Sequence, residues 1–197
     1  YVTEFGTRQN GALEGIAFSQ DYSSLYASME EPLYQDGPRA DVIRNNAWTR
    51  IYKYDAATRQ NVTQYAYELE PVAFPPFPPT AFKVNGISEI LFLNDYKLLT
   101  IERSFSTGKL ACTVKVFEAD LSKADNIMSV PSLKENPSAN PIKKKLLLNM
   151  NTLGIYIDNV EGVTFGPRLA SGHQTLVFVT DNNFGKSQKT HFLLFEV

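Results

Sequence analysis

The feature that most constrains the fold is a short phrase that occurs three times. It reads Asn-Val-Glu-Gly-Val-Thr-Phe from residue 159, Asn-Gly-Ala-Leu-Glu-Gly-Ile-Ala-Phe from residue 10 and, more loosely, Asn-Gly-Ile-Ser-Glu-Ile-Leu-Phe from residue 85. Its glutamates stand at positions 14, 89 and 161, at intervals of 75 and 72 residues. Recurrence at a nearly constant spacing is typical of repeat architectures. Each copy therefore predicts the start of one structural unit.

Short alternating apolar and polar runs, separated by turn residues, predict strands within each unit. The units cover approximately residues 10–70, 84–150 and 158–197, with four, four and three expected strands. Five prolines between residues 71 and 79 exclude a regular strand or helix there, so this stretch is interpreted as an extended connector. Sustained helical periodicity is absent from the sequence. The prediction is an all-β protein of antiparallel meanders.

Antiparallel meanders of four strands are the blades of a β-propeller, which typically has at least four blades. The sequence supplies about three. We therefore expect residues 1–197 to form a single propeller domain that is the C-terminal part of a larger, six-bladed ring. The remaining blades would precede this sequence or belong to another chain. A last blade with three strands is expected where a ring closes with a strand from its other end.

Composition narrows the classes of function. The net charge is −2 with 43% hydrophobic residues, and such a balance argues against nucleic-acid binding, which needs a basic surface. No apolar run approaches the ~20 residues that span a bilayer. The single cysteine, Cys112, lies in a strand-like alternation and is interpreted as a packed thiol, so neither a disulfide nor a cysteine zinc site is expected.

The geometry of a propeller blade predicts that the repeated phrases contribute to one candidate site. The first strand of a blade lines the central channel, and the second runs antiparallel beside it, so the start of one lies near the end of the other. Acidic and amide side chains from all three units should then gather at one channel mouth. The expected neighbours are Glu14 with Glu30 and Glu31, Glu89 with Glu102 and Arg103, and Glu161 with Asp181, Asn182 and Asn183.

An oxygen-only set of this kind suits Ca²⁺, with Mg²⁺ as the alternative. The predicted metal ligands are Glu14, Glu30, Glu89, Glu161, Asp181 and Asn182. Glu161 and Arg103 are the predicted catalytic residues, although Arg103 could instead neutralise Glu102. The alternative interpretation of the repeated Glu-Gly pair is a turn whose carboxylate caps backbone N–H groups, and Asp181 and Asn182 could equally be ordinary turn residues.

Three segments resemble a known family. They run from Asn10 to Phe18, from Asp158 to Leu169 and from Thr175 to Phe184, and the C-terminal Phe-Leu-Leu-Phe-Glu-Val is similar as well. Together they resemble the phytase-like family described as "esterase-like activity of phytase". The resemblance implies a β-propeller, secreted or periplasmic, that hydrolyses phosphate esters or other esters.

By position, the resemblance implies that the site residues include Glu14, Glu161, Asp181 and Asn182. The middle unit departs from the phrase because Ser88-Glu89-Ile90 replaces the Glu-Gly pair.

Three functions follow from these observations. The first is a metal-assisted hydrolase of small phosphate esters, whose anionic substrate would need basic residues at the rim. The second is a carboxylester or lactone hydrolase on the same scaffold, and the third is a non-catalytic propeller that binds a ligand or partner. A serine-nucleophile hydrolase is not expected because the Gly-x-Ser-x-Gly elbow is missing. The candidate rim residues are Arg50, Arg103, Arg168 and Lys186.

Overall fold

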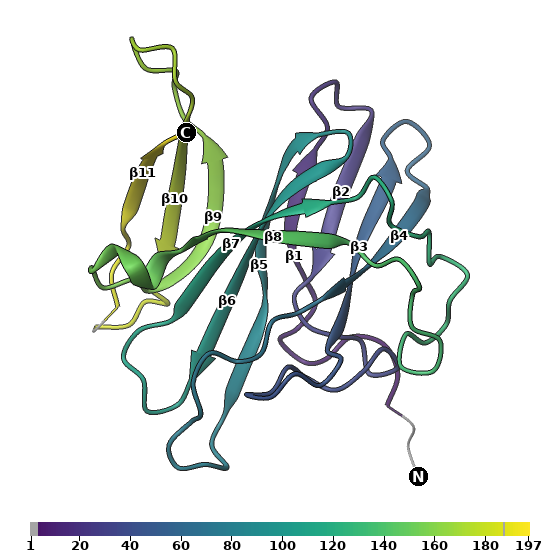
Figure 1. Cartoon of the computed structure of the whole chain (residues 1–197), viewed down its shortest axis with the longest axis horizontal. Helices are drawn as coiled ribbons and strands as arrows, with labels where there is room; N and C mark the ends of the chain where they lie inside the picture. Colours follow the sequence, from purple (N-terminus) through teal and green to yellow (C-terminus); the bar gives the residue numbers. More distant parts are fainter. Residues whose placement is uncertain (1–3, 187) are drawn as a thin grey trace.

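The computed structural model describes residues 4–186 and 188–197, which form eleven strands and one short 3-10 helix (Figure 1). The strands make three antiparallel sheets with the neighbour orders β1-β2-β3-β4, β5-β6-β7-β8 and β9-β10-β11. Each sheet is a meander, because strands adjacent in sequence are adjacent in space. The sequence prediction of four, four and three strands is confirmed for the described residues.

The first sheet contains β1 (Leu13–Phe18), β2 (Ser24–Met29), β3 (Trp48–Asp55) and β4 (Asn61–Glu68). The second contains β5 (Lys83–Asn94), β6 (Lys97–Ser106), β7 (Thr113–Asp120) and β8 (Lys143–Asn149). The 3-10 helix η1 (Met150–Leu153) leads to the third sheet, which contains β9 (Asn159–Phe165), β10 (Thr175–Asp181) and β11 (Phe192–Glu196).

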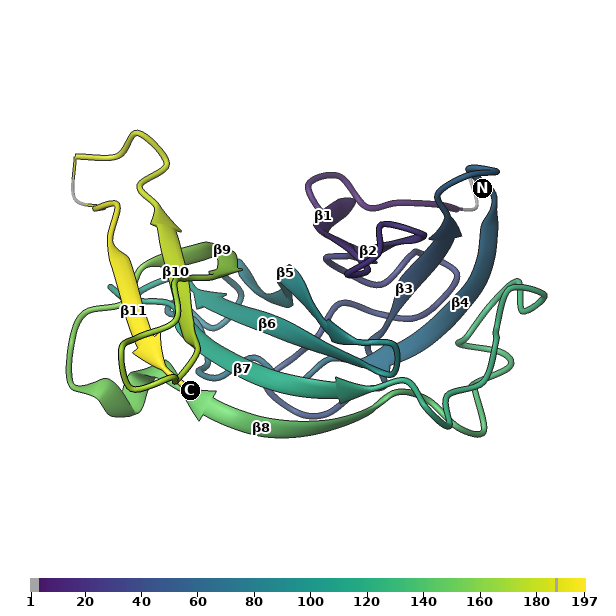
Figure 2. The same ribbon diagram turned by 90° about the horizontal axis from the view of Figure 1, so that it is seen from above.

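The sheets are arranged in an arc, with β1, β5 and β9 on its inner side and β4, β8 and β11 toward the outside (Figure 2). β5 contacts both β1 and β9, so the first strands of the three units lie side by side. This layout is consistent with three consecutive propeller blades. Within the described residues the arc is open and does not close into a ring.

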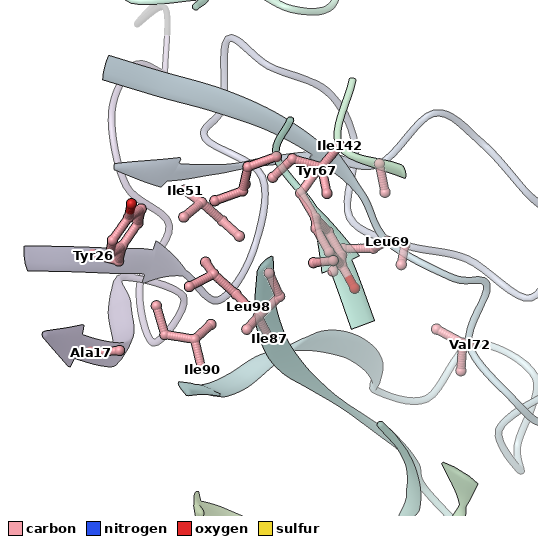
Figure 3. Packing of buried hydrophobic residues seen from close by; sticks show 14 residues of the cluster. Ala17, Tyr26, Ile51, Tyr67, Leu69, Val72, Ile87, Ile90, Leu98 and Ile142 are labelled. Carbon is pink, nitrogen blue, oxygen red and sulfur yellow. The ribbon is translucent and has the colours of Figure 1, made fainter. Parts of the chain in front are cut away.

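Sheet 2 lies between the other two and packs against each through its own apolar layer. Between sheets 1 and 2, Tyr26, Ile51 and Tyr67 face Ile87 and Leu98, and all five are almost completely buried (Figure 3). Alternate residues of a strand point to opposite faces of a sheet. Leu99 and Ile101 of β6 therefore pack on the opposite side, against Val160, Leu176 and Phe178 of sheet 3.

Each inner strand contains a β-bulge near its start. The register of β1 with β2 shifts at Glu14-Gly15, and that of β9 with β10 shifts at Glu161. In β5 the extra residue is Ser88, between the pairs Ile87 with Glu102 and Glu89 with Ile101. A bulge adds a residue and re-aims its side chain.

The equivalence of Glu89 with the other two glutamates was therefore wrong by one position. Ser88 occupies the place of Glu14 and Glu161, and a shift of one residue moves a side chain to the other face of the sheet. Glu89 consequently pairs with Ile101, and Arg103 pairs with Gly86, so the expected neighbours of Glu89 were wrong too.

Among the described residues, no helix has the length and apolar character needed to cross a membrane.

Candidate functional site

Arg103 lies at the centre of a cluster of carboxylates at the starts of the inner strands. Its Nη2 donates to Glu30 Oε1 at 2.9 Å and lies 3.8 Å from Glu161 Oε1. One guanidinium nitrogen of β6 therefore contacts a carboxylate just after β2 in the first sheet and another near the start of β9 in the third. The side chain is 17% exposed, and its Nε has no hydrogen-bond partner among the described residues.

Glu30 reaches the cluster because the chain after β2 packs directly against β5. Ile87 N donates to Glu30 O at 3.1 Å, which fixes the backbone of Glu30 on the second sheet. Gly86, opposite Arg103 in the register, permits this approach. A Cβ at Gly86 would lie 2.6 Å from Glu30 Cγ and 2.9 Å from Glu30 O. The glycine in the middle copy of the repeated phrase is thus required by packing between sheets.

Glu14 enters the cluster from the bulge of β1. Gly15, the next residue, is buried against sheet 2, and a Cβ there would lie 2.7 Å from Ile90 N. Glu14 itself is exposed at the start of the strand. The Glu-Gly pair therefore combines a glycine that lets two sheets meet with a carboxylate at their junction.

Glu161 is held at the bulge of β9 by its neighbour Asn159. Asn159 Nδ2 donates to Glu161 Oε1 at 2.6 Å, while Asn159 Oδ1 is buried and has no hydrogen-bond partner among the described residues. Asn159 is only 4% exposed, and the carboxylate side chain of Glu161 is 36% exposed. A buried amide oxygen without a partner loses hydration without compensation, so this arrangement is energetically costly unless another group binds the oxygen.

Burial and neighbouring carboxylates raise the pKa values of Glu30 and Glu14. Burial raises the pKa of Glu30 to about 7; the Arg103 guanidinium opposes the shift, and Glu14, Glu31 and Glu161 add to it. The pKa of Glu14 is also raised, first by partial burial and then by the charge of Glu161, with Arg103 again opposing. The ion pairs of Arg103 bring Glu30 and Glu161 into one cluster, and the direction of the Glu14 shift is the one expected for a carboxyl group near Glu161.

A cleft of about 640 Å³ opens beside the cluster. Arg103 and Glu30 form part of its wall, together with Arg8 and Arg39. Arg8 lies over the ring of Tyr34, with 4.4 Å from Cζ to the ring centroid, and donates to two backbone carbonyls. The cleft is thus rimmed by three guanidinium groups close to the carboxylates.

Arg39 pairs with the second glutamate of this region, Glu31. Its Nε lies 2.7 Å from Glu31 Oε2, and Glu31 is 2% exposed. Burial raises the pKa of Glu31, and the nearby Arg39 and Arg8 lower it. Glu31 therefore belongs to the wall of the cleft, next to the Arg103 cluster but with its own partner. Sequence reasoning missed Arg8 and Arg39 because loop residues carry no periodic signal.

Glu89 has a structural position between the first two sheets. Its Oε1 accepts hydrogen bonds from Ile16 N at 3.2 Å and Ile90 N at 2.9 Å. Its pKa is raised by burial, an effect that these two backbone hydrogen bonds partly offset. The carboxylate therefore caps backbone N–H groups, which was the alternative interpretation of the repeated glutamates. Its role as a ligand stays a prediction.

Asp181 and Asn182 lie at the end of β10, where Asp181 pairs with Asn159. Asp181 Oδ1 accepts from Asn183 N at 3.0 Å, and Asn182 Oδ1 accepts from Phe184 N at 3.0 Å. Both side chains thus stabilise the following turn. Their roles as metal ligands also stay predictions.

Two of the expected rim residues lie elsewhere. Arg50 is 5% exposed and makes a buried bidentate pair with Asp36, with distances of 2.6 and 2.7 Å. Arg168 lines a different groove, at the far ends of the inner strands. The expectation that these arginines flank the cluster was wrong, because linear sequence does not show which blade face a side chain occupies.

The fold and the site define a class of protein. Its antiparallel sheets resemble propeller blades, and they carry a cluster of acidic and basic side chains where the inner strands begin. The family described as "Phytase-like: Esterase-like activity of phytase" has a model that matches residues 2–184. The chain belongs to this phytase-like family, as the sequence resemblance predicted. The family description indicates a hydrolase-type function. No curated protein and no solved structure matched the chain.

Proposed function

We propose that this protein is a metal-assisted hydrolase of small phosphate esters. The observation that carries the proposal is the convergence of Glu14, Glu30 and Glu161 on Arg103 beside a cleft with arginines at its rim. Carboxylates attract a divalent cation, whereas guanidinium groups bind phosphate through paired N–H donors. Membership of the phytase-like family supports the same class of substrate.

The cluster carries oxygen atoms of the chemical type that a hard cation prefers. Glu14, Glu30 and Glu161 supply carboxylate oxygens, and Asn159 supplies a buried amide oxygen that has no other partner among the described residues. Ca²⁺ accepts such a mixture of oxygen ligands, and Mg²⁺ is the alternative. When bound, the cation would polarise a phosphoryl oxygen and lower the pKa of a bound water. The described residues hold no ready-made group of three or more His, Cys, Asp or Glu for a metal ion.

The chain's own residues would position the substrate. Arg103 lines the cleft and contacts the carboxylates at once, so it is the group best placed to hold a phosphate next to them. Arg8 and Arg39 offer positive charge on the same wall.

The family also suggests where the protein acts. We propose a secreted or periplasmic location, which is compatible with weak calcium binding, because extracellular modules commonly bind Ca²⁺ with dissociation constants of about 10⁻⁴–10⁻³ M.

The test is hydrolysis of phenyl phosphate by the purified protein. We expect activity that EDTA abolishes and Ca²⁺ restores, and a loss of about 100-fold or more in Glu161→Gln. Asp55→Asn, a change in an exposed turn far along β3, serves as the matched control and should retain full activity. Activity that survives EDTA would contradict metal assistance.

The second candidate is hydrolysis of carboxylic esters or lactones, favoured by the esterase-like description of the family. A groove of about 670 Å³ at the far ends of the inner strands has an apolar side, with Ile16, Phe18 and Phe165 exposed along it. A parallel assay with phenyl acetate separates the two substrate classes. Metal binding without turnover of either ester would identify the third candidate, a non-catalytic binding platform.

A further inference from the structure

The repeated phrase contains an Asn-Gly pair in two of its three copies, Asn10-Gly11 and Asn85-Gly86. In such a pair the backbone nitrogen of the glycine can attack the side-chain amide of the asparagine, because glycine has no side chain to hinder the approach. The product is a cyclic imide that water opens to an acid. The structure places these two chemically identical pairs in opposite environments, so their reactivities should differ.

Packing between the loops and sheets requires glycine in both pairs. A Cβ at Gly11 would lie 2.7 Å from Glu31 Oε1, and a Cβ at Gly86 would lie 2.6 Å from Glu30 Cγ. Asn10 has a φ of +59°, a left-handed conformation that asparagine adopts more readily than most residues. The fold therefore favours a reactive dipeptide at residues 10 and 11.

The pair in β5 is protected from this reaction. Asn85 is 2% exposed, and its Nδ2 donates to Glu70 O at 2.8 Å and to Glu102 Oε2 at 2.7 Å. The pair also lies within the paired part of β5 and β6, where Asn85 is opposite Ser104. Ring closure would require the amide to leave both acceptors and the strand to rotate, so the reaction needs a large local unfolding.

The pair before β1 is open to solvent. Asn10 is exposed and lies in a turn that the hydrogen bond from Gly11 N to Arg8 O closes at 3.2 Å. This contact is an isolated bridge outside the named strands. Opening of one turn is a much smaller fluctuation than opening of a buried strand, and it frees the attacking nitrogen.

We propose that Asn10 is a site of spontaneous deamidation in the folded protein. The nitrogen of Gly11 forms a bond to Asn10 Cγ and gives up its proton, the bond between Cγ and Nδ2 breaks, and Nδ2 leaves with that proton as ammonia. Water then opens the imide. Attack at Cγ yields aspartate, and attack at the backbone carbonyl yields isoaspartate, in which the main chain runs through the former side chain. Water is the only co-reactant.

The reaction changes the charge of the arginine-rimmed cleft. Asn10 lines this cleft together with Arg8, Arg39 and Arg103. Either product replaces a neutral amide with a carboxylate, so the wall becomes more negative by one charge. A carboxylate there repels a bound phosphate group and should weaken its binding. This consequence rests on the proposed phosphate substrate, whereas the deamidation itself does not.

The first test compares the two pairs within the same molecule. The folded protein is incubated in mildly alkaline heavy-oxygen water, and peptide mapping by mass spectrometry follows label incorporation at Asn10 and Asn85. Asn10 should react at least about 10-fold faster, which corresponds to a barrier lower by about 1.4 kcal/mol. In urea-unfolded protein the two rates should agree within about 3-fold, because the protection of Asn85 depends on native structure.

Asn10→Gly is the matched control, since glycine tolerates a positive φ and has no amide to lose. The more acidic species that ion-exchange chromatography resolves in aged wild type should be strongly reduced in this variant. A rate at Asn10 that is less than about 10-fold above that at Asn85 in the folded protein would overturn the proposal. The same holds if Asn10 stays intact while both pairs react in urea.

The second test measures the consequence with inorganic phosphate as the probe. Asn10→Asp, which reproduces the added charge, should bind phosphate about 5-fold more weakly than Asn10→Gly. Equal affinities would overturn the effect on the cleft. Failure of the wild-type protein to bind phosphate would overturn the phosphate site of the proposed function, and the ratio of the two deamidation rates would still decide the inference about Asn10.

Discussion

Two neighbouring residues of β6, Glu102 and Arg103, differ in how completely their buried charged groups are paired. Because adjacent strand residues point to opposite faces, Glu102 faces sheet 1 and Arg103 faces the cluster with Glu161. Glu102 is 1% exposed and accepts from Tyr67 OH at 2.9 Å, Glu70 N at 2.9 Å and Asn85 Nδ2 at 2.7 Å.

Lys144 completes the first of these two environments. Its Nζ lies 2.5 Å from Glu102 Oε1 and donates to Glu68 O at 2.7 Å, and it lies over the rings of Tyr67 and Phe117. The Glu102 network is thus saturated with partners, whereas in the Arg103 cluster Arg103 Nε and the amide oxygen of Asn159 have no partner in the part of the chain that the structure describes. The comparison indicates that the first network holds two sheets together, and the incomplete pairing of the second supports the proposal that a ligand binds there.

The largest effect is expected from a substitution that breaks the saturated Glu102 network. Lys144→Met removes the cation and leaves the buried Glu102 without its charge partner, which typically costs about 3–5 kcal/mol. Urea unfolding followed by circular dichroism measures this loss. Lys145→Met, at an exposed position of the same strand, is the control and should change stability by less than about 0.5 kcal/mol. Equal stability of the two variants would show that the network is not a structural link.

The next prediction concerns the pH dependence of the incomplete cluster. The pKa of Glu30 rises from 4.5 to about 7 on folding, so the folded state binds its proton more tightly than the unfolded state. The resulting stabilisation is present below pH 4.5 and is lost as the pH rises toward about 7.

Glu30→Gln should therefore flatten the decline in unfolding free energy across this window, by about 1–3 kcal/mol. Chemical denaturation at several pH values measures the decline. An identical pH profile in wild type and variant would mean that Glu30 titrates normally.

An effect of similar size is expected where the first two sheets meet. Gly86→Ala places a Cβ 2.9 Å from the carbonyl oxygen of Glu30, so the chain after β2 must move away from β5. Overpacking of this kind costs typically about 1–3 kcal/mol. The Ca²⁺ affinity should fall as well, because Glu30 moves relative to Glu161. Gly154→Ala, in an open turn, tests whether a glycine change without such a contact leaves Ca²⁺ binding intact.

The smallest effect is expected at the end of β10. Asp181→Ala removes the acceptor for Asn183 N, a turn hydrogen bond worth about 0.5–1.5 kcal/mol. Since that carboxylate is already engaged in its own turn, Ca²⁺ affinity should change by less than about 2-fold. A calorimetric loss comparable to that of Glu161→Gln would instead establish Asp181 as a ligand.

Sequence patterning predicted much of this fold. The strands, the number per unit and the three restarts follow from alternation, turn residues and a repeated phrase, which are local properties of the chain. The gathering of Glu14, Glu30, Arg103 and Glu161 was also predicted, because strand direction within a meander brings these positions to one edge.

The errors have a shared physical cause. Glu89 was aligned with Glu14 and Glu161, but a bulge at Ser88 changes the register by one residue and gives Glu89 a capping role. Arg50 was expected at the site and is instead paired in the interior with Asp36. Bulges and blade faces depend on how sheets pack, which a single strand does not encode.

The sequence by itself determined the all-β class and the succession of units, since each depends on residues close together in the chain. Only the tertiary structure decided which partner each charged side chain takes within the cluster and around it. Glu30 reaches Arg103 from another sheet, Arg8 and Arg39 come from loops, and Lys144 pairs with Glu102 on the opposite face of β6 from Arg103. Electrostatic energy depends on distance and solvent exposure, and both are set when the sheets pack together.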